Sequence, residues 1–122
     1  MMENVSSQAY LYFFSRVPPR PEQETLGSYH GAEIPYVFNN VDAMDWTLED
    51  TDVELSRIMS DYWLNFASSG NPNGEGLPLW APYRLEEEPY IQFGDKVEPG
   101  SQGFLTRDFE FFDVYFTWRR SR

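Results

Sequence analysis

Hydrophobic and polar positions along this chain follow different periods, and each period predicts a different element. From Ala9 to Ser15 the apolar residues run almost without a break, which is typical of a strand covered on both faces in a parallel sheet. Three prolines between Val17 and Pro21 end this strand, because proline cannot donate to a ladder. Tyr90 to Phe93 alternates, and this pattern predicts a second short strand at an edge of the sheet.

The best helix in the sequence is predicted from about Asp52 to Ser68. Thr51 and Glu54 have the spacing of a capping box at its start, and Gly70 suits a left-handed cap at its end. The apolar positions form one stripe at helical spacing, as a helix that docks on a core requires. They are Leu55, Ile58, Met59, Tyr62, Trp63 and Phe66.

Two shorter patterns complete the expected architecture. Ile34 to Phe38 predicts a short helix or turn with Pro35 in its first turn. Leu105 to Arg120 predicts a closing helix with cations near its C-terminal end. The elements together indicate the α/β class, mostly helical with two short strands.

Composition excludes several functional classes. The chain has 122 residues, the size of one small domain, and its net charge of -11 disfavours nucleic acid and anionic membrane surfaces as partners. Without cysteine there is no thiolate metal site. The three glutamates 86–88 predict a solvated acidic turn and not a metal site, because no histidine or aspartate stands beside them. No metal or other cofactor is expected. No stretch approaches the roughly 20 apolar residues of a membrane anchor.

The candidate for chemistry is His30, the only histidine of the chain. It lies between Gly27 and Gly31, where the backbone can adopt positive φ, so we expect it on a loop and not on an element face. Loops of this kind often carry general bases. On these residues alone, an incidental surface histidine is the simpler interpretation.

The residues around His30 change that interpretation. The segment GSYHGAEIPYVFNN resembles the region around the catalytic histidine of the type B carboxylesterases, the cholinesterase-like branch of the α/β-hydrolases. The segments AYLYFFSRVPP, LSRIMSDYWLNFASSGNPNGEGLPLWAPY and PYIQF resemble the same family in the same order, so the resemblance extends from about Ala9 to about Phe116. It implies that residues 1–122 form the C-terminal part of an α/β-hydrolase domain, which is therefore incomplete.

The resemblance also implies roles for individual residues. His30 would be the general base and acid of a catalytic triad, and Gly27 and Gly31 would shape its loop. Glu33 would hydrogen-bond near the histidine or cap the short helix, although a carboxylate that acts only on the helix dipole is an equal alternative. The nucleophile is missing, because the chain has no Gly-x-Ser-x-Gly segment, and Ser28 stands too near His30 in sequence to replace it. The oxyanion turn and the triad acid are missing as well.

We therefore expect part of a carboxylic ester hydrolase that contributes the triad histidine and is inactive alone. Two alternatives stay open: a non-catalytic cholinesterase-like binding or adhesion module, and a dimerisation module. The expected partners are an ester substrate in the complete enzyme, and the missing N-terminal portion of the domain or a second copy along the Ala9 to Phe14 strand. The sequence leaves the compartment open, and the resemblance is compatible with a soluble, secreted protein.

Overall fold

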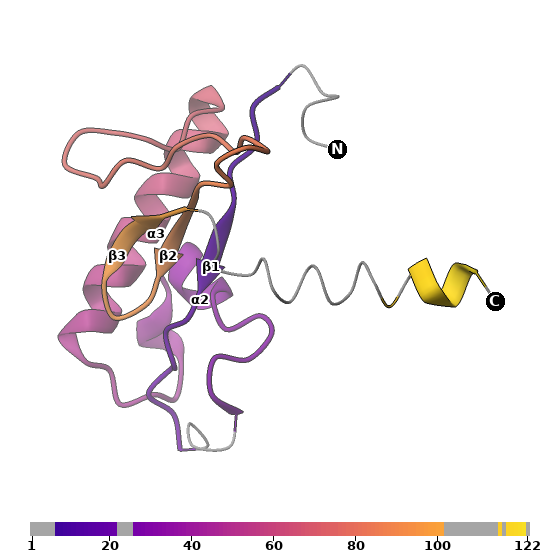
Figure 1. Cartoon of the computed structure of the whole chain (residues 1–122). Coiled ribbons are helices and arrows are strands. Elements are labelled where there is room, and N and C mark those ends of the chain that lie inside the picture. Colours follow the sequence, from indigo (N-terminus) through magenta and orange to yellow (C-terminus); the bar gives the residue numbers. More distant parts are fainter. Residues whose placement is uncertain (1–6, 22–25, 102–114, 116, 122) are drawn as a thin grey trace.

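The fold is built around a small mixed sheet, shown by the computed structural model in Figure 1. The structure describes residues 7–21, 26–101, 115 and 117–121. The sheet has the order β1-β2-β3, formed by β1 (Tyr12–Phe14), β2 (Tyr90–Phe93) and β3 (Val97–Gly100). β1 and β2 are parallel with Tyr12 opposite Ile91, whereas β2 and β3 form an antiparallel hairpin. The helices lie in the long connection between β1 and β2, as a parallel pair requires.

The first strand is confirmed but is shorter than the predicted Ala9 to Ser15. The chain stays bonded on either side of β1: the Tyr83 amide donates to the Ala9 carbonyl at 2.7 Å, and the Ser15 amide donates to the Phe93 carbonyl at 2.9 Å. Regular pairing is limited by β2, which has only four residues. All three residues of β1 are half-buried, so the expected cover on both faces is absent from the described part of the chain.

Two strand predictions were wrong. β2 was expected at an edge of the sheet, but it lies in the centre between β1 and β3. β3 was not predicted, because its sequence Val-Glu-Pro-Gly lacks apolar alternation and contains two residues that are rare inside strands. The turn after Phe93 brings it into register, with the Gly94 amide donating to the Lys96 carbonyl at 3.2 Å. The sheet therefore has three strands where two were expected.

The long helix α3 (Asp50–Ser69) confirms the predicted amphipathic stripe, with one correction at its start. The N-cap is Glu49 and not Thr51, and Asp52 at the third helical position accepts a hydrogen bond from the Glu49 amide at 3.0 Å. Aspartate so near the N-terminus also interacts favourably with the helix dipole. Gly70 ends the helix with φ of 78°, in the left-handed conformation that was predicted.

The short helix α2 (Ile34–Val37) is confirmed, with Pro35 in its first turn. Asn39 follows with φ of 52°, which asparagine tolerates better than most residues. A single 3-10 turn, η2 (Val41–Ala43), then leads toward α3. The Ser56 hydroxyl of α3 donates to the Tyr36 carbonyl at 3.0 Å, so α2 is bonded directly to the long helix.

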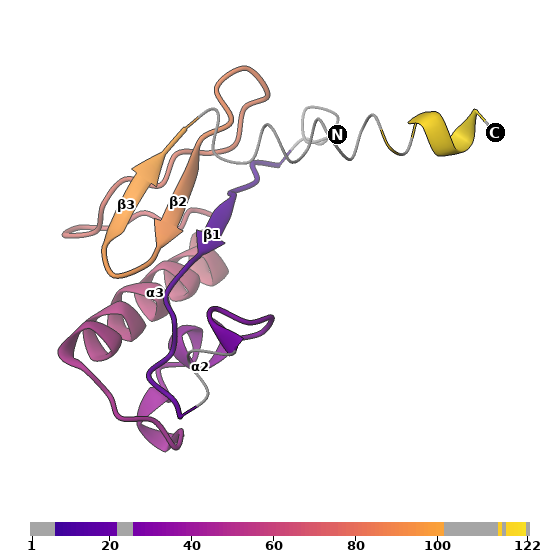
Figure 2. The same ribbon diagram turned by 60° about the horizontal axis from the view of Figure 1, so that its bottom comes forward.

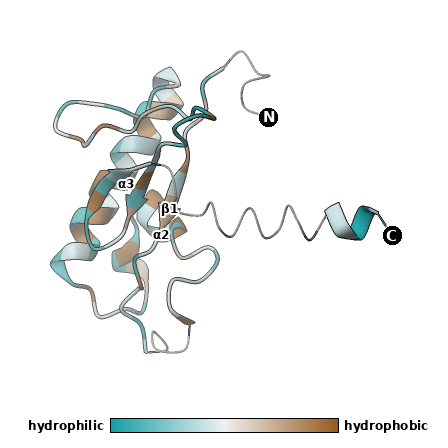
Figure 3. Ribbon diagram, in the orientation of Figure 1, coloured by the Kyte–Doolittle hydropathy of each residue, from teal (hydrophilic) through white to brown (hydrophobic). Residues whose placement is uncertain are grey.

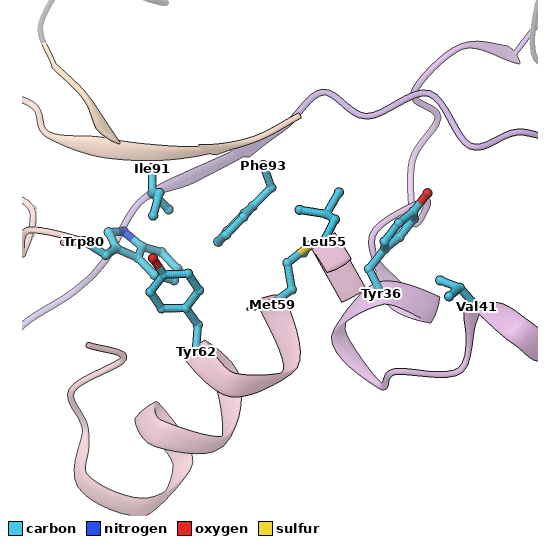
Figure 4. Close-up of a cluster of buried hydrophobic side chains, with 8 residues drawn as sticks. All are labelled: Tyr36, Val41, Leu55, Met59, Tyr62, Trp80, Ile91 and Phe93. Carbon is cyan, nitrogen blue, oxygen red and sulfur yellow. The ribbon is translucent and has the colours of Figure 1, made fainter. Parts of the chain in front are cut away.

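The core lies between α3 and one face of the sheet, and Figure 4 shows its side chains meeting there. α3 and β2 contribute Met59, Tyr62, Ile91 and Phe93, all fully buried. Trp80 joins them from the loop after α3, where its indole donates to the Leu11 carbonyl at 2.9 Å. This bond fastens the loop to the strand side of the core.

Hydrophobic cover is unequal on the two faces of the sheet. Figure 2 shows that α3 and α2 both lie on the same face of the sheet. In Figure 3 the 84–88 turn is mostly teal and the C-terminal helical residues are pale to teal, whereas brown segments lie on the strands, α2 and α3. The turn confirms the predicted acidic segment, with an ion pair between Arg84 and Glu87 at 2.6 Å.

The predicted closing helix, Leu105 to Arg120, lies mostly outside the described residues. Tyr115 and residues 117–120 are helical and exposed. Within the described part of the chain, no helix is long and apolar enough to cross a lipid bilayer.

Candidate functional site

His30 lies in a tight turn between β1 and α2. The Ala32 amide donates to the Tyr29 carbonyl at 3.0 Å, and the Ile34 amide donates to the Gly31 carbonyl at 3.2 Å. These overlapping bonds form the turn and lead directly into α2. The His30 side chain is exposed, and the described residues include no hydrogen-bond or ion-pair partner for its imidazole.

The two glycines beside the histidine have the backbone conformation expected from the sequence. Gly27 has φ of 56° and Gly31 has φ of 85°, a region that residues with a Cβ rarely adopt. A Cβ built on Gly31 would lie 3.7 Å from the Ile34 Cδ1 atom, which is an ordinary contact. Glycine at position 31 is therefore needed for the backbone conformation and not for space.

Both arms of the histidine loop are fastened to the body of the protein. Pro18 and Pro19 are buried, and the Pro19 carbonyl accepts a bond from the Thr47 amide at 2.9 Å. On the other arm, the Ser28 hydroxyl donates to the Phe14 carbonyl at 3.2 Å. The Ser28 proton is thus directed to the end of β1. This leaves Ser28 unsuited to be a nucleophile whose proton His30 would accept.

Glu33 contacts the sheet and does not cap the helix with its side chain. It occupies the N-cap position of α2, but its carboxylate makes no capping bond. Instead, Glu33 Oε1 accepts a long hydrogen bond of 3.4 Å from the Tyr12 hydroxyl of β1. Burial, together with this carboxylate, raises the pKa of Tyr12. Of the roles considered from the sequence, side-chain capping is therefore wrong, whereas a hydrogen bond beside the histidine turn is present.

A buried polar cluster below this loop was missed from the sequence. Arg16 follows β1, Tyr36 lies in α2, and Asp52 lies in the first turn of α3; all three are buried. Asp52 receives two bonds from the Arg16 guanidinium, at 2.8 and 2.9 Å, and one from the Tyr36 hydroxyl at 2.7 Å. The signal available in the sequence was an arginine directly after an apolar strand and an aspartate in the first turn of an amphipathic helix.

The charges of this cluster stabilise one another. Burial alone would raise the pKa of Asp52, but hydrogen bonds from Arg16, Tyr36 and the Glu49 amide outweigh burial and lower it. Burial, followed by the bond to Asp52, raises the pKa of Tyr36 far above its ordinary value. Asp52 is therefore ionised and Tyr36 neutral across the physiological range.

An aromatic cavity of about 170 Å³ lies between β1, the C-terminal half of α3 and Trp80. His30 does not line it. Two of its polar groups are bonded within the protein, since the Tyr62 hydroxyl donates to the Pro78 carbonyl at 2.5 Å and the Trp80 indole donates to the Leu11 carbonyl. The described residues contain no cluster of three or more metal-ligating side chains.

The structure thus brings Glu33 and both glycines to the histidine turn, but it places no nucleophile or acid beside the imidazole within the described residues. What this arrangement offers chemically is an exposed imidazole on a turn that backbone hydrogen bonds hold in front of α2. Such a group can accept and return a proton when a reacting group is brought to it.

Comparison with known proteins places these features in a wider context. Residues 1–112 match the model of the carboxylesterase family. The human cocaine esterase is 40% identical over 89 residues, covering 68% of this chain and 15% of that protein. The liver carboxylesterase of Sus scrofa is 37% identical over 94 residues, covering 75% of this chain and 16% of that protein. The chain therefore spans about a sixth of the length of these relatives.

Solved structures agree with the sequence comparison. A thermophilic PNB esterase superposes with a TM-score of 0.70 at 23% identity, over 82% of this chain and 21% of that one. An esterase from anaerobic Clostridium hathewayi superposes with a TM-score of 0.68 at 24% identity, over 77% of this chain and 19% of that one. These likenesses identify the fold as part of an α/β-hydrolase. Because the family model matches nearly the whole sequence, we conclude that this chain belongs to the carboxylesterase family.

Proposed function

We propose that this chain is the histidine-bearing part of a serine-type carboxylic ester hydrolase. In that reaction His30 takes the proton of a serine hydroxyl as the serine oxygen attacks the ester carbonyl. It then gives the proton to the departing alcohol, leaving an acyl-enzyme. Water cleaves the acyl-enzyme by the same two proton transfers, which release the carboxylic acid and restore the serine.

The observation that supports this role most is that the His30 imidazole is exposed and bonds to no described residue. His30 is exposed on a turn with several backbone bonds, and no described residue occupies either of its nitrogens. A histidine kept only for packing would be buried or bonded within the chain. An exposed imidazole on a rigid turn suits a group whose two partners come from elsewhere, one on each nitrogen.

The other residues of the turn have supporting roles in this proposal. Gly27 and Gly31 provide the positive φ values that let the turn form. Glu33 links the turn to β1 through Tyr12, which limits movement of the turn relative to the sheet. None of the three would contact the substrate.

The chain alone is expected to be inactive, because it lacks a nucleophile elbow. We infer that the remaining portion of an esterase domain is its partner, and that the outer edge of β1 is the joining surface. Leu11 accepts from the Ile91 amide and Ser15 donates to Phe93, so these alternate residues face β2. The backbone groups of Tyr12, between them, face the opposite edge, where no described strand lies.

The substrate class that fits the family is a carboxylic ester. The relatives that match are carboxylesterases and esterases by name, and nothing in the described residues resembles a binding site for a particular acyl or alcohol group. The pocket that selects the ester is expected in the part of the domain that this chain lacks.

The test is expression of this chain together with the sequence encoded upstream of Met1, which we call the restored domain. We expect it to hydrolyse p-nitrophenyl acetate and the isolated chain not to do so. His30→Ala should lower kcat of the restored domain by about 10⁴-fold or more, as loss of a triad histidine does in other serine hydrolases. Ser28→Ala tests the serine nearest to His30 in sequence, and because its hydroxyl only helps to fasten the turn, kcat should fall far less than in His30→Ala.

Full activity in His30→Ala would overturn the proposal, and so would an upstream sequence without a Gly-x-Ser-x-Gly segment. The outer edge of β1, which pairs with no described strand, also favours a second candidate, a module that pairs with another copy through this strand. That candidate predicts a stable dimer with no esterase activity in either form of the protein. The measured activity therefore separates the two candidates.

A further inference from the structure

One carboxylate in the described residues, that of Asp52, has every acceptor position used. Its Oδ1 atom accepts from Arg16 Nε at 2.8 Å and from the Tyr36 hydroxyl at 2.7 Å. Its Oδ2 atom accepts from Arg16 Nη2 at 2.9 Å and from the Glu49 amide at 3.0 Å. An ionised carboxylate offers about four lone-pair sites, so none is left over. The side chain is also fully buried.

The donors to this carboxylate come from three separate parts of the chain. Arg16 stands two residues after the end of β1, where the histidine loop begins. Tyr36 belongs to α2, into which the histidine turn leads. Glu49 precedes α3, which carries Asp52 itself. The two ends of the loop that contains His30 are therefore fastened to one point at the N-terminus of the long helix.

We propose that Asp52 is a positioning residue for His30, because its carboxylate holds both ends of the segment that carries the imidazole. The bidentate pair with Arg16 fixes where the chain leaves the sheet. The bond from Tyr36 fixes where the chain enters α2. Between these two points the segment is closed, so its tip has far fewer conformations than a free loop of the same length.

A direct role for Asp52 as the triad acid does not fit the same geometry. Such an acid must accept a bond from the imidazole, but Asp52 has no acceptor site left and is shielded from solvent. His30 is exposed and has no partner among the described residues. Asp52 therefore acts on the histidine through the backbone of the loop.

A second carboxylate supports one end of this arrangement only. Asp95, in the turn between β2 and β3, accepts from Arg16 Nη1 at 2.8 Å and is largely exposed. It contacts neither Tyr36 nor α2 in the described part of the chain. Asp95 therefore holds the start of the loop without closing it.

Tyrosine-to-phenylalanine substitutions provide a matched pair for the test. Tyr36→Phe removes the bond to Asp52 and keeps both the Ser56 bond to the Tyr36 carbonyl and the ring, which packs 5.2 Å from Phe14 by ring centroids. Tyr62→Phe removes a buried hydroxyl of the same kind, bonded to the Pro78 carbonyl, in the far part of α3. Both are milder than changing Asp52, so each variant is expected to fold.

The first readout is amide hydrogen exchange of the full 122-residue chain, followed by mass spectrometry on peptides from residues 26–36. We expect exchange there to become at least tenfold faster in Tyr36→Phe, because the loop can open without global unfolding. In Tyr62→Phe, the exchange rate of residues 26–36 should increase no more than the exchange rate of α3. Equal effects of the two variants on residues 26–36, or no effect of Tyr36→Phe, would overturn the proposal.

The second readout uses the restored domain and rests on the proposed function. Misplacing the imidazole slows proton transfer more than it weakens ester binding, so Tyr36→Phe should lower kcat at least tenfold with KM within twofold. Tyr62→Phe should leave both constants near wild type. Unchanged kcat in Tyr36→Phe would contradict positioning. If the restored domain lacks activity, the proposed function fails, while the exchange measurement still decides whether Asp52 closes the loop.

Discussion

At the scale of single residues, the most consequential group is a buried ion pair and not a hydrophobic side chain. Arg16 and Asp52 leave water on folding, which costs free energy that close bidentate geometry and the Tyr36 bond must offset. The lowered pKa of Asp52 reflects that balance, because the donors around it favour the charged form more than burial opposes it.

This lowered pKa predicts a loss of stability in acid. An unfolded aspartate titrates near 3.9, and the folded value of Asp52 lies below its ordinary value. Its contribution to the free energy of unfolding is therefore present above about pH 4 and is lost as pH falls through the folded pKa. Urea unfolding of wild type and Asp52→Asn between pH 2 and pH 7 measures this contribution.

At pH 7, Asp52→Asn should lose about 3–5 kcal/mol, as expected when a buried pair loses one partner. The gap between the two proteins should narrow as the pH falls below 4. Asp61→Asn is the control, because Asp61 makes only an exposed pair with Arg57 and should cost less than about 1 kcal/mol. A gap between wild type and Asp52→Asn that stays constant with pH would show that the charge of Asp52 is not what stabilises the fold.

At the scale of elements, the parts that could be predicted from the sequence are those with a strong local signal. The period of apolar residues located α3 within two residues at its start and one at its end, and Gly70 marked its cap. The parallel strand β1 was visible as an apolar run. The glycines around His30 correctly indicated a turn with positive φ.

Elements that depend on partners distant in sequence could not be found in this way. β3 contains proline and glycine, and it forms a strand only because β2 and the Gly94 turn hold it in register. β2 is central for the same reason. The pairing of Arg16 with Asp52 joins residues 36 positions apart, and no local pattern relates them. The sequence thus located the histidine turn but not what holds it.

The turn itself gives an element-scale prediction. Gly31→Ala should destabilise the protein by about 1–2 kcal/mol, because alanine must adopt φ near 85° in a conformation that costs about this much for residues with a Cβ. Gly27→Asn should cost less, since φ of 56° suits asparagine and nothing lies within 4 Å of an added Cβ. Thermal unfolding of both variants measures the difference. Equal losses would mean that backbone conformation at Gly31 does not limit the turn.

At the scale of the whole molecule, the described chain is a sheet with one face covered by helices and one long edge without a neighbour. β1 ends the strand order on that side, and Ile34 of α2 and the C-cap residue Phe38 are exposed, at 54% and 72%. In parallel sheets such edges and faces are normally buried. This arrangement is compatible with our proposal that the chain joins the remaining portion of an esterase domain.

The proposal that this chain is part of a larger domain predicts the behaviour of the isolated chain. It should self-associate in sedimentation velocity experiments or bind a hydrophobic dye such as ANS, because no strand within the described residues pairs with the outer edge of β1. The restored domain should be monodisperse and bind much less dye per molecule. A monomeric isolated chain that melts cooperatively and binds no dye would contradict the prediction.

The measurement that tests the account most directly is the rate at which a serine-directed fluorophosphonate labels the restored domain. The account predicts covalent labelling of a serine outside residues 1–122, at a rate that falls at least 10³-fold in His30→Ala, because this imidazole activates the serine hydroxyl. Ser28→Ala, which removes only a bond that fastens the turn, should lower the labelling rate far less than His30→Ala. Labelling that proceeds equally fast without His30, or that modifies Ser28, would contradict the central claim.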